Sequence, residues 1–227
     1  MADRRWLARI ATPLLAASAL AVVIVAGDLP LRAHRELDSG RSRAAVALRD
    51  HVIPFQQWGT KLFTLPHLES AYDHVYYLTE AIPGDQHDAM VADLEQALRE
   101  NDEVDLFLLA HSNRFIYWAS EVPPELREKL RLVYNTGCGD AVQGPSWLAL
   151  GARAYVGHPS SHSLSPIFYV YFLRRWVRGW SLGDAVSAAN GEAHRRVTWF
   201  GLDDPAGDPR AVLVGRADLW VGGEAEK

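Results

Sequence analysis

The chain has 227 residues, of which 48% are hydrophobic and 22% charged, so it can build a folded core and does not resemble a disordered chain. Its formal net charge of -5 disfavours nucleic acid as a partner, because phosphate binding needs Lys and Arg clustered on one face. A single cysteine, Cys138, excludes an internal disulfide, so any redox or nucleophilic role belongs to this one thiol.

The first predicted element is an apolar helix at the N-terminus. The run Ile10–Gly27 contains no charged residue and follows three arginines, Arg4, Arg5 and Arg9. Its length is at the short end of the ~20 apolar residues that cross a bilayer, and the arginines favour an N-inside orientation. We expect an uncleaved signal anchor in the cell membrane, with a cleaved signal peptide and a secreted product as the alternative. Both place the C-terminal domain outside the cytoplasm.

Four segments follow from this pattern. Residues 1–28 are predicted to be the signal anchor or signal peptide, and the polar residues 29–60 a membrane-proximal linker. The α/β domain is predicted over 61–221, with a short tail over 222–227. No internal repeat or low-complexity tract suggests a further domain.

Within the predicted domain, strand-like and helix-like segments alternate. Strands are predicted at 61–65, 74–79, 104–110, 131–137, 153–158 and 210–222. Helices are predicted at 85–101, 122–130, 144–152, 164–179 and 181–196. The fourth helix segment contains a run of aromatics, and Ser181 is expected to cap the fifth. Alternation of this kind predicts a mostly parallel sheet with helices on its faces, and sites at the carboxyl ends of its strands.

Two of these strand ends carry reactive groups. His111 follows the strand at 104–110, and Cys138 lies just beyond the strand at 131–137. If the two strands are neighbours, spaced ~4.8 Å apart, both side chains lie at the same edge of the sheet. An imidazole there can take the thiol proton and create the nucleophilic thiolate. The competing interpretation is that Cys138 is an inert core residue and His111 a hydrogen-bonded structural one.

The backbone around the two residues also suits acyl chemistry. Gly137 and Gly139 permit a sharp turn and leave room for a peptide to lie across the sulfur of Cys138. The backbone N–H groups of Ser112 and Cys138 are candidate donors to an oxyanion.

Five stretches between Lys61 and Val221 share their order and spacing with a known family. They are "DLFLLAHSN", "LRLVYNTGCGDA", "WLALGARAYVGHPSS", "LSPIFYVYFLRRWVRGWSLGDAVSAAN" and "AVLVGRADLWV". Together they resemble the caspase-like superfamily of cysteine peptidases, which includes caspases, legumains, gingipains, separases and CHAT domains. The CHAT and gingipain-like members are the most similar. In that superfamily one strand ends in a catalytic His, and the next ends in a small-residue turn that carries the catalytic Cys.

The resemblance implies a caspase-like three-layer sandwich with a mostly parallel central sheet, preceded here by the N-terminal hydrophobic helix. It implies a cysteine endopeptidase that uses a His111/Cys138 dyad on a peptide or protein substrate, without a cofactor or metal. Ser112 stands where the family usually has Gly, which puts efficient hydrolysis in doubt. The alternatives are a catalytically inactive caspase-like domain that binds a partner at the cell envelope, and a plain α/β envelope protein with a structural cysteine.

Further residues near the two strand ends are candidates for substrate contact. Besides Gly137 and Gly139, Asp140 is expected either to line a pocket for a basic side chain or to cap a turn. His158 and Ser160, in the loop "GHPSSHS", are expected to lie beside the site. His158 and His162 have the spacing of a helical metal pair, but Pro159 argues for a loop and no third ligand is evident, so no metal site is expected. The stretch "AHSNR" lacks the glycines of a serine-hydrolase elbow, which excludes that class.

Overall fold

The central feature of the fold is a six-stranded sheet. The computed structural model describes residues 40–51, 54–111, 113–202 and 205–224. The sheet has the order β2-β1-β3-β4-β5-β6, in which β1 to β5 run parallel and β6 runs antiparallel to β5. Its strands are β1 (Arg43–Arg49), β2 (His74–Thr79), β3 (Glu103–Leu109), β4 (Leu130–Asn135), β5 (Ala154–Gly157) and β6 (Val212–Gly215). The prediction of a mostly parallel α/β sheet is confirmed.

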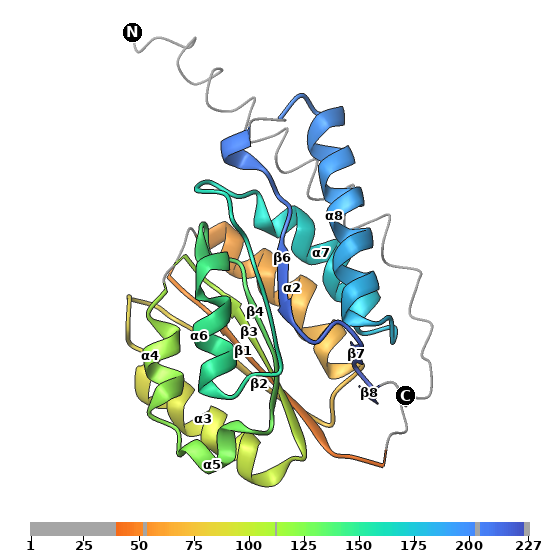
Figure 1. The fold of residues 1–227 in the computed structure, drawn as a ribbon. Helices are drawn as coiled ribbons and strands as arrows, with labels where there is room; N and C mark the ends of the chain where they lie inside the picture. Colours follow the sequence, from red (N-terminus) through yellow and green to blue (C-terminus); the bar gives the residue numbers. More distant parts are fainter. Residues whose placement is uncertain (1–39, 52–53, 112, 203–204, 225–227) are drawn as a thin grey trace, which may run out of the picture. The chain divides into compact units, whose positions relative to one another are not determined.

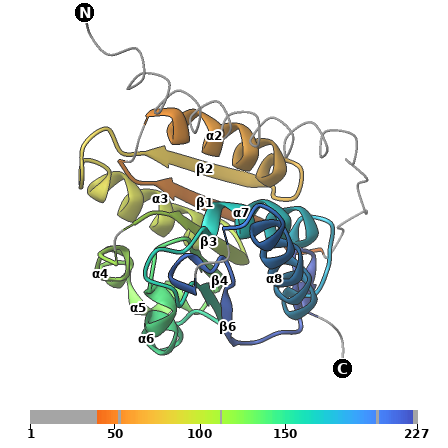
Figure 2. The same ribbon diagram turned by 90° about the horizontal axis from the view of Figure 1, so that it is seen from above.

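Helices cover both faces of the sheet (Figures 1 and 2). One face carries α2 (Pro54–Glu69), α7 (Ser165–Trp176) and α8 (Leu182–Trp199). The other carries α3 (His87–Glu100), α4 (Phe115–Ser120), α5 (Pro124–Arg127) and α6 (Gly144–Leu150). Because each face packs against helices through its own hydrophobic cluster, the arrangement is compatible with a three-layer sandwich. The hydrophobic helix predicted at the N-terminus lies outside the described residues.

Most predicted elements appear close to their expected bounds. The strands β2 to β6 and the helices α3, α5, α6, α7 and α8 all overlap the predicted segments. Ser181 is the N-cap of α8, where its hydroxyl oxygen accepts a hydrogen bond from the Asp184 N–H at 3.1 Å. Gly151 ends α6 with a φ of 127°, a conformation that favours glycine. The short helix α4 was not predicted.

The sheet begins earlier than the sequence predicts. Strand β1, "RAAVALR", lies inside the predicted linker 29–60, yet it occupies an interior position between β2 and β3 and is buried along its whole length. A strand buried on both faces shows no alternation of polar and apolar residues, and its alanines have a low β propensity. Its two arginines gave it the composition of a polar linker. The folded domain therefore includes β1 and does not start at residue 61.

The predicted strand at 61–65 is also wrong, because these residues form part of α2. Thr64 and Leu68 are both fully buried, as expected for neighbours four residues apart on one face of a helix. A run of five residues is too short for the strand and helix periodicities to be distinguished.

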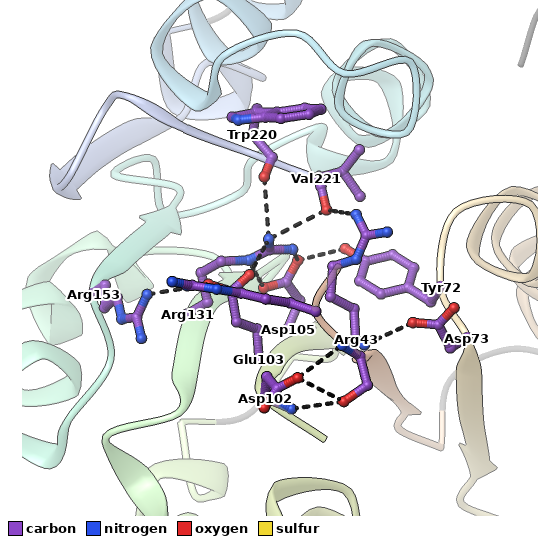
Figure 3. Close-up of polar contacts among 12 residues, drawn as sticks. Arg43, Tyr72, Asp73, Asp102, Glu103, Asp105, Arg131, Arg153, Trp220 and Val221 are labelled. Atoms are coloured by element: carbon purple, nitrogen blue, oxygen red, sulfur yellow. Dashed lines mark hydrogen bonds and ion pairs between the residues drawn. The ribbon is translucent and has the colours of Figure 1, made fainter. Parts of the chain in front are cut away.

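The amino ends of the central strands are closed by a buried ionic cluster (Figure 3). Arg131 donates hydrogen bonds to Asp105 at 2.6 and 2.9 Å and to Glu103 at 2.9 Å. The chain's C-terminal part lies over this cluster, where the carbonyl of Val221 accepts hydrogen bonds from both Arg131 and Arg43. Burial, the largest single effect, lowers the pKa of Arg131, but the combined effects of Asp105, Tyr72 and Glu103 outweigh it, so the pKa is raised.

The predicted tail 222–227 needs a correction at its start. Strand β8 (Gly223–Glu224) pairs antiparallel with β7 (Leu219–Trp220), so the ordered domain continues past residue 221. Trp220, Val221 and the ionic cluster lie at the amino edge of the sheet, opposite the carboxyl edge where the sequence predicts a site.

Candidate functional site

His111 and Cys138 follow neighbouring parallel strands. β3 pairs with β4 from Val104 to Leu108, His111 lies two residues beyond β3, and Cys138 lies three residues beyond β4. The expectation that the two residues end adjacent strands at the carboxyl edge is therefore confirmed. The His111 side chain is 61% exposed and the Cys138 side chain is partly exposed, so both are open to solvent at this edge.

Thr136 joins the two strand ends. Its hydroxyl oxygen accepts a hydrogen bond from the Ala110 N–H at 2.8 Å and lies 3.2 Å from the Ala110 carbonyl oxygen, to which it donates. Its own N–H donates to the Leu108 carbonyl at 2.9 Å. Since Ala110 precedes His111 directly and Thr136 precedes Cys138 by two residues, these bonds fix the backbone of the histidine loop against that of the cysteine turn.

Asp50 is a third group at the same edge, and sequence analysis missed it. It follows β1 directly, is 5% exposed, and accepts a hydrogen bond from the His111 backbone N–H at 2.5 Å. Its other oxygen lies 3.5 Å from Nδ1 of His111, too long for a strong hydrogen bond but close enough for an ion pair. Asp50 is the main cause of a raised pKa at His111, with burial opposing it.

This contact determines what the imidazole can do. With Nδ1 facing a carboxylate, the proton of the neutral ring is favoured on Nδ1, and Nε2 is left as the basic nitrogen. A base oriented by an acid is the arrangement found in nucleophilic sites that use Ser or Cys. The signal for Asp50 was present in the sequence as an acid directly after an apolar run. An acid in this position indicates a site only if the apolar run before it is a strand, and the sequence analysis had placed that run in the linker.

The glycines beside Cys138 are required by the turn itself. Gly139 has a φ of 73°, and a Cβ at this position would meet no atom within 4 Å. A Cβ on Gly137 would lie 1.9 Å from the nearer carboxylate oxygen of Asp140. The space over Gly137 is therefore filled by Asp140, which corrects the expectation that Gly137 leaves room for substrate. Whether Gly139 contacts substrate stays a prediction.

Asp140 serves the turn and not a pocket. It is 8% exposed, and its carboxylate accepts hydrogen bonds from Asn135 Nδ2 at 3.0 Å and Gln143 Nε2 at 3.4 Å. It begins the 3₁₀ helix η1 (Asp140–Gln143), and its carbonyl accepts from the Tyr155 hydroxyl at 2.7 Å. Burial raises its pKa. Of the two roles weighed for Asp140, the structure supports the turn-stabilising one.

His158 is also a structural residue. It is fully buried, its Nε2 lies 3.1 Å from the Tyr134 hydroxyl, and its Nδ1 lies 3.2 Å from the Arg210 carbonyl. Burial lowers its pKa to about 4, so it is neutral near pH 7. The expectation that His158 contacts substrate is wrong, because position in a loop does not reveal that the ring points into the core.

The loop that carries His158 does lie beside the cysteine turn. The carbonyls of His158 and Ser160 accept hydrogen bonds from the N–H groups of Ala141 and Gly139, at 3.1 and 2.9 Å. The Ser160 side chain is half-buried and donates to the Pro205 carbonyl at 3.4 Å, so its role towards substrate stays a prediction. The Cys138 thiol itself has one weak contact, 3.9 Å from the Ser163 carbonyl oxygen.

Of the two expected oxyanion donors, only Cys138 belongs to the described residues. Ser112 lies outside the described residues. The Cys138 N–H meets no acceptor within the part of the chain that the structure describes, so its role as an oxyanion donor stays a prediction.

Glu80 holds the surrounding loops together. It is fully buried at the end of β2, and its carboxylate accepts hydrogen bonds from the His51 N–H at 3.3 Å, the Gly84 N–H at 2.9 Å and Arg114 Nη2 at 2.6 Å. His51 follows Asp50, and Arg114 lies three residues beyond His111. One carboxylate therefore ties the loop after β1 to the loop after β3, and so supports the Asp50–His111 contact.

Two other expectations concern metals and membranes. Over the described ranges, no three or more His, Cys, Asp and Glu side chains come together in a way that holds a metal ion. None of the helices in those ranges has the length and apolarity needed to cross a bilayer. The segment predicted to do so, Ile10–Gly27, lies outside them.

Comparison with known proteins adds no assignment. No protein-family model matches the chain, and no curated protein matches it significantly.

Proposed function

We propose that the protein is a cysteine endopeptidase with a caspase-like fold, in which Cys138 is the nucleophile and His111 the general base. The observation that carries the proposal is the contact between Asp50 and His111 at the end of β3, beside the strand that leads to the free thiol. Asp50 acts as a positioning residue that orients the imidazole and stabilises its protonated form. The sheet order and the antiparallel last strand are compatible with this fold.

The proposed reaction has two stages, acylation of Cys138 and hydrolysis of the resulting thioester. His111 Nε2 takes the thiol proton, and the sulfur of Cys138 forms a bond to the peptide carbonyl carbon while the oxyanion is held by the N–H groups of Cys138 and Ser112. The imidazolium then gives its proton to the leaving amine as the C–N bond breaks. Water, deprotonated by His111, hydrolyses the thioester and regenerates the thiol.

The test is a peptidase or self-cleavage assay on the purified chain, with the melting temperature measured on the same samples. Cys138→Ser and His111→Ala are expected to abolish activity, and Cys138→Ser to leave the melting temperature nearly unchanged because the thiol is partly exposed. If Cys138→Ser lowers the melting temperature by several degrees and leaves the activity intact, the thiol is a packing group and the proposal fails.

The second candidate is an inactive caspase-like domain that binds a partner at the cell envelope. Ser112, in place of the usual Gly, favours it. This alternative predicts that the fold and the Asp50–His111 contact persist without thiol reactivity. In both cases we propose that the segment Ile10–Gly27 anchors the protein in the membrane, with the α/β domain outside the cytoplasm.

A further inference from the structure

The turn between α7 and α8 carries a group of arginines in a stretch of sequence without acids. Arg174 and Arg175 lie in the last turn of α7, and Arg178 follows two residues after the helix ends. The nearest acids in the sequence are Asp140 before them and Asp184 after them. The whole chain has a net charge of -5, so this basic stretch departs from its average composition.

The three positive charges are close enough to act on one another. The pKa of Arg174 is lowered, chiefly by burial and then by the charges of Arg178 and Arg175. Like charges that lie this close repel one another, and a negatively charged partner relieves the repulsion. The group is therefore suited to an anionic surface.

Trp180 adds an exposed aromatic ring to the arginines. Its side chain is 45% exposed, and the guanidinium carbon of Arg175 lies 5.6 Å from the centre of its ring. The turn is well ordered: Gly179 has a φ of 79°, and the Trp180 N–H donates to the Arg175 carbonyl at 3.2 Å. An ordered turn loses little conformational entropy when it binds a partner. We call Arg174, Arg175, Arg178 and Trp180 the basic turn.

The basic turn lies at the amino edge of the sheet. Trp176, the last residue of α7, donates to the Tyr72 hydroxyl at 2.8 Å, and the Arg131 guanidinium carbon lies 5.4 Å from the centre of its ring. The Gly183 N–H donates to the Ala217 carbonyl at 2.8 Å, so the start of α8 lies beside the chain that leads into β7 (Figure 1). Both contacts place the turn near the ionic cluster, at the edge opposite the candidate site.

The chain enters the folded domain at this same edge. Just before and at the start of β1, the Ser42 N–H donates to Asp102 at 2.9 Å and the Arg43 N–H donates to Asp73 at 2.8 Å. Twelve residues, 28–39, separate the predicted apolar anchor from the described chain. Fully extended, twelve residues span at most ~40 Å. A membrane that holds the anchor is therefore within reach of the amino edge.

Several carboxylates near this edge are engaged within the domain. Asp105 and Glu103 bind Arg131, and Asp218 pairs with Arg216 at 2.6 Å. These ion pairs partly neutralise the negative charges that would otherwise repel an anionic surface.

We propose that the basic turn docks on the anionic phospholipid headgroups of the membrane in which the protein is anchored. This inference rests on the proposed membrane anchor and is independent of the peptidase. Guanidinium groups bind phosphate oxygens through their N–H donors, and Trp rings favour the interface between headgroups and hydrocarbon. The anchor holds the domain near the surface, so its effective concentration there is high and three arginines suffice.

Docking through the basic turn orients the candidate site. With the amino edge of the sheet against the headgroups, the carboxyl edge that bears His111 and Cys138 points away from the bilayer. Substrates then reach the site from the aqueous side, and the site acts on soluble segments and not on chains buried in the bilayer.

The experiment is hydroxyl-radical footprinting of the full-length chain in nanodiscs of phosphatidylglycerol and of phosphatidylcholine. Mass spectrometry measures the oxidation rate of Trp180, with Trp199 as the internal reference, since it is 73% exposed at the other end of α8. The rate for Trp180 relative to Trp199 is expected to fall about fivefold or more in the anionic nanodiscs and to stay unchanged in the zwitterionic ones. Raising NaCl to about 0.5 M is expected to restore it, because salt screens the attraction.

Variants locate the effect. Arg178→Gln is expected to weaken docking about fivefold, as the loss of one arginine near an anionic surface does, and Arg175→Gln with Arg178→Gln to abolish the protection. The matched control, Arg195→Gln with Arg196→Gln, removes two charges near the other end of α8 and should keep Trp180 protected. Equal oxidation of Trp180 in both lipids, or protection that survives in the first double variant, overturns the proposal. Protection in detergent that grows with protein concentration identifies a second copy as the occupant and overturns it too.

A parallel measurement separates failure of the docking from failure of the anchor. Retention of the chain on phosphatidylcholine nanodiscs in about 1 M NaCl reports the anchor alone, because salt removes electrostatic binding. A retained chain whose Trp180 is oxidised equally in both lipids refutes the docking and keeps the anchor. A chain that is washed off, yet has Trp180 protected by phosphatidylglycerol, keeps the basic turn as a lipid-binding surface and removes the anchor.

Discussion

At the scale of single residues, the contact between Asp50 and His111 determines the acid–base properties of the candidate site. A histidine with an ordinary pKa near ~6.5 is only partly protonated at neutral pH. The neighbouring carboxylate raises the pKa of His111 because it stabilises the imidazolium. That shift favours the transfer of a thiol proton to the ring. The contact between Asp50 and protonated His111 also stabilises the folded state. This contribution is fully present below the pKa of His111 in the unfolded chain, and it is lost as the pH rises through the raised pKa of His111 in the folded chain.

The Asp50→Asn variant tests this contact. We expect the pKa of His111 to fall, because the variant removes the charge and keeps the size of the side chain. The measurement is an NMR titration of the His111 Cε1 proton. Asp88→Asn is the control, since Asp88 faces His87 at 2.7 Å and should change the titration of His87 alone. A His111 titration unchanged by Asp50→Asn would show that Asp50 does not orient the ring.

His158 makes the second prediction at this scale. Its pKa is about 4 in the folded chain, below the unfolded value, so the unfolded state binds more protons between roughly pH 6.5 and 4. The free energy of unfolding should therefore fall as the pH is lowered through this window. Urea denaturation at pH 7.0 and pH 4.5 measures the fall, and His158→Gln should reduce it. An identical fall in His158→Gln would assign the pH dependence to other groups.

The hydrophobic pattern of the sequence shows where strands end, but it does not show where a side chain points. His111 and Cys138 were found because strand ends are visible in the hydrophobic pattern. His158 and Asp140 were assigned to substrate because sequence shows that a residue lies in a loop but not where its side chain points. Asp50 was missed because β1, which it follows, is buried on both faces and so shows no alternation.

At the scale of elements, the bonds of Thr136 hold the ends of β3 and β4 in register. Three hydrogen bonds involve the Ala110 N–H, the Ala110 carbonyl and the Leu108 carbonyl. They fix the two backbones from which His111 and Cys138 project. The β-strand pairing was predictable in outline, but this side-chain bridge depends on register, which a single sequence does not give.

Thr136→Val tests the bridge. The valine keeps the shape of the side chain and leaves the Ala110 N–H without its acceptor, which costs about 1–3 kcal/mol of folding stability for a buried donor. Thr136→Ser keeps the hydroxyl and is the matched control. Chemical denaturation measures both variants. Equal stability of Thr136→Val and the parent chain would show that the bridge contributes nothing to the register.

At the scale of the whole molecule, the two edges of the sheet have different roles. The amino edge is closed by the ionic cluster around Arg131, whose guanidinium donates hydrogen bonds to the carbonyl oxygens of Trp220 and Val221. The carboxyl edge carries Asp50, His111 and Cys138. Sequence alternation predicted the α/β class and the edge that bears the site, because both follow from parallel strand connections. It did not predict the closing cluster, which joins residues far apart in the chain.

The location of the molecule is a prediction at the same scale. The uncharged run Ile10–Gly27 behind three arginines predicts an N-inside anchor. Membrane fractionation should recover the full-length chain with the membrane, and protease added outside that membrane should digest the α/β domain. Recovery of the full-length chain in the soluble cytoplasmic fraction would contradict the anchor.

The central claim is that His111 activates Cys138, and the alkylation rate of that thiol against pH tests it most directly. The chain contains one cysteine, so iodoacetamide reports on Cys138 alone. We predict rapid labelling of the parent chain at neutral pH, and a rate at least tenfold lower in His111→Ala that recovers only above about pH 8.5, where an ordinary thiol ionises. Superimposable rate profiles for the parent chain and His111→Ala would contradict the dyad.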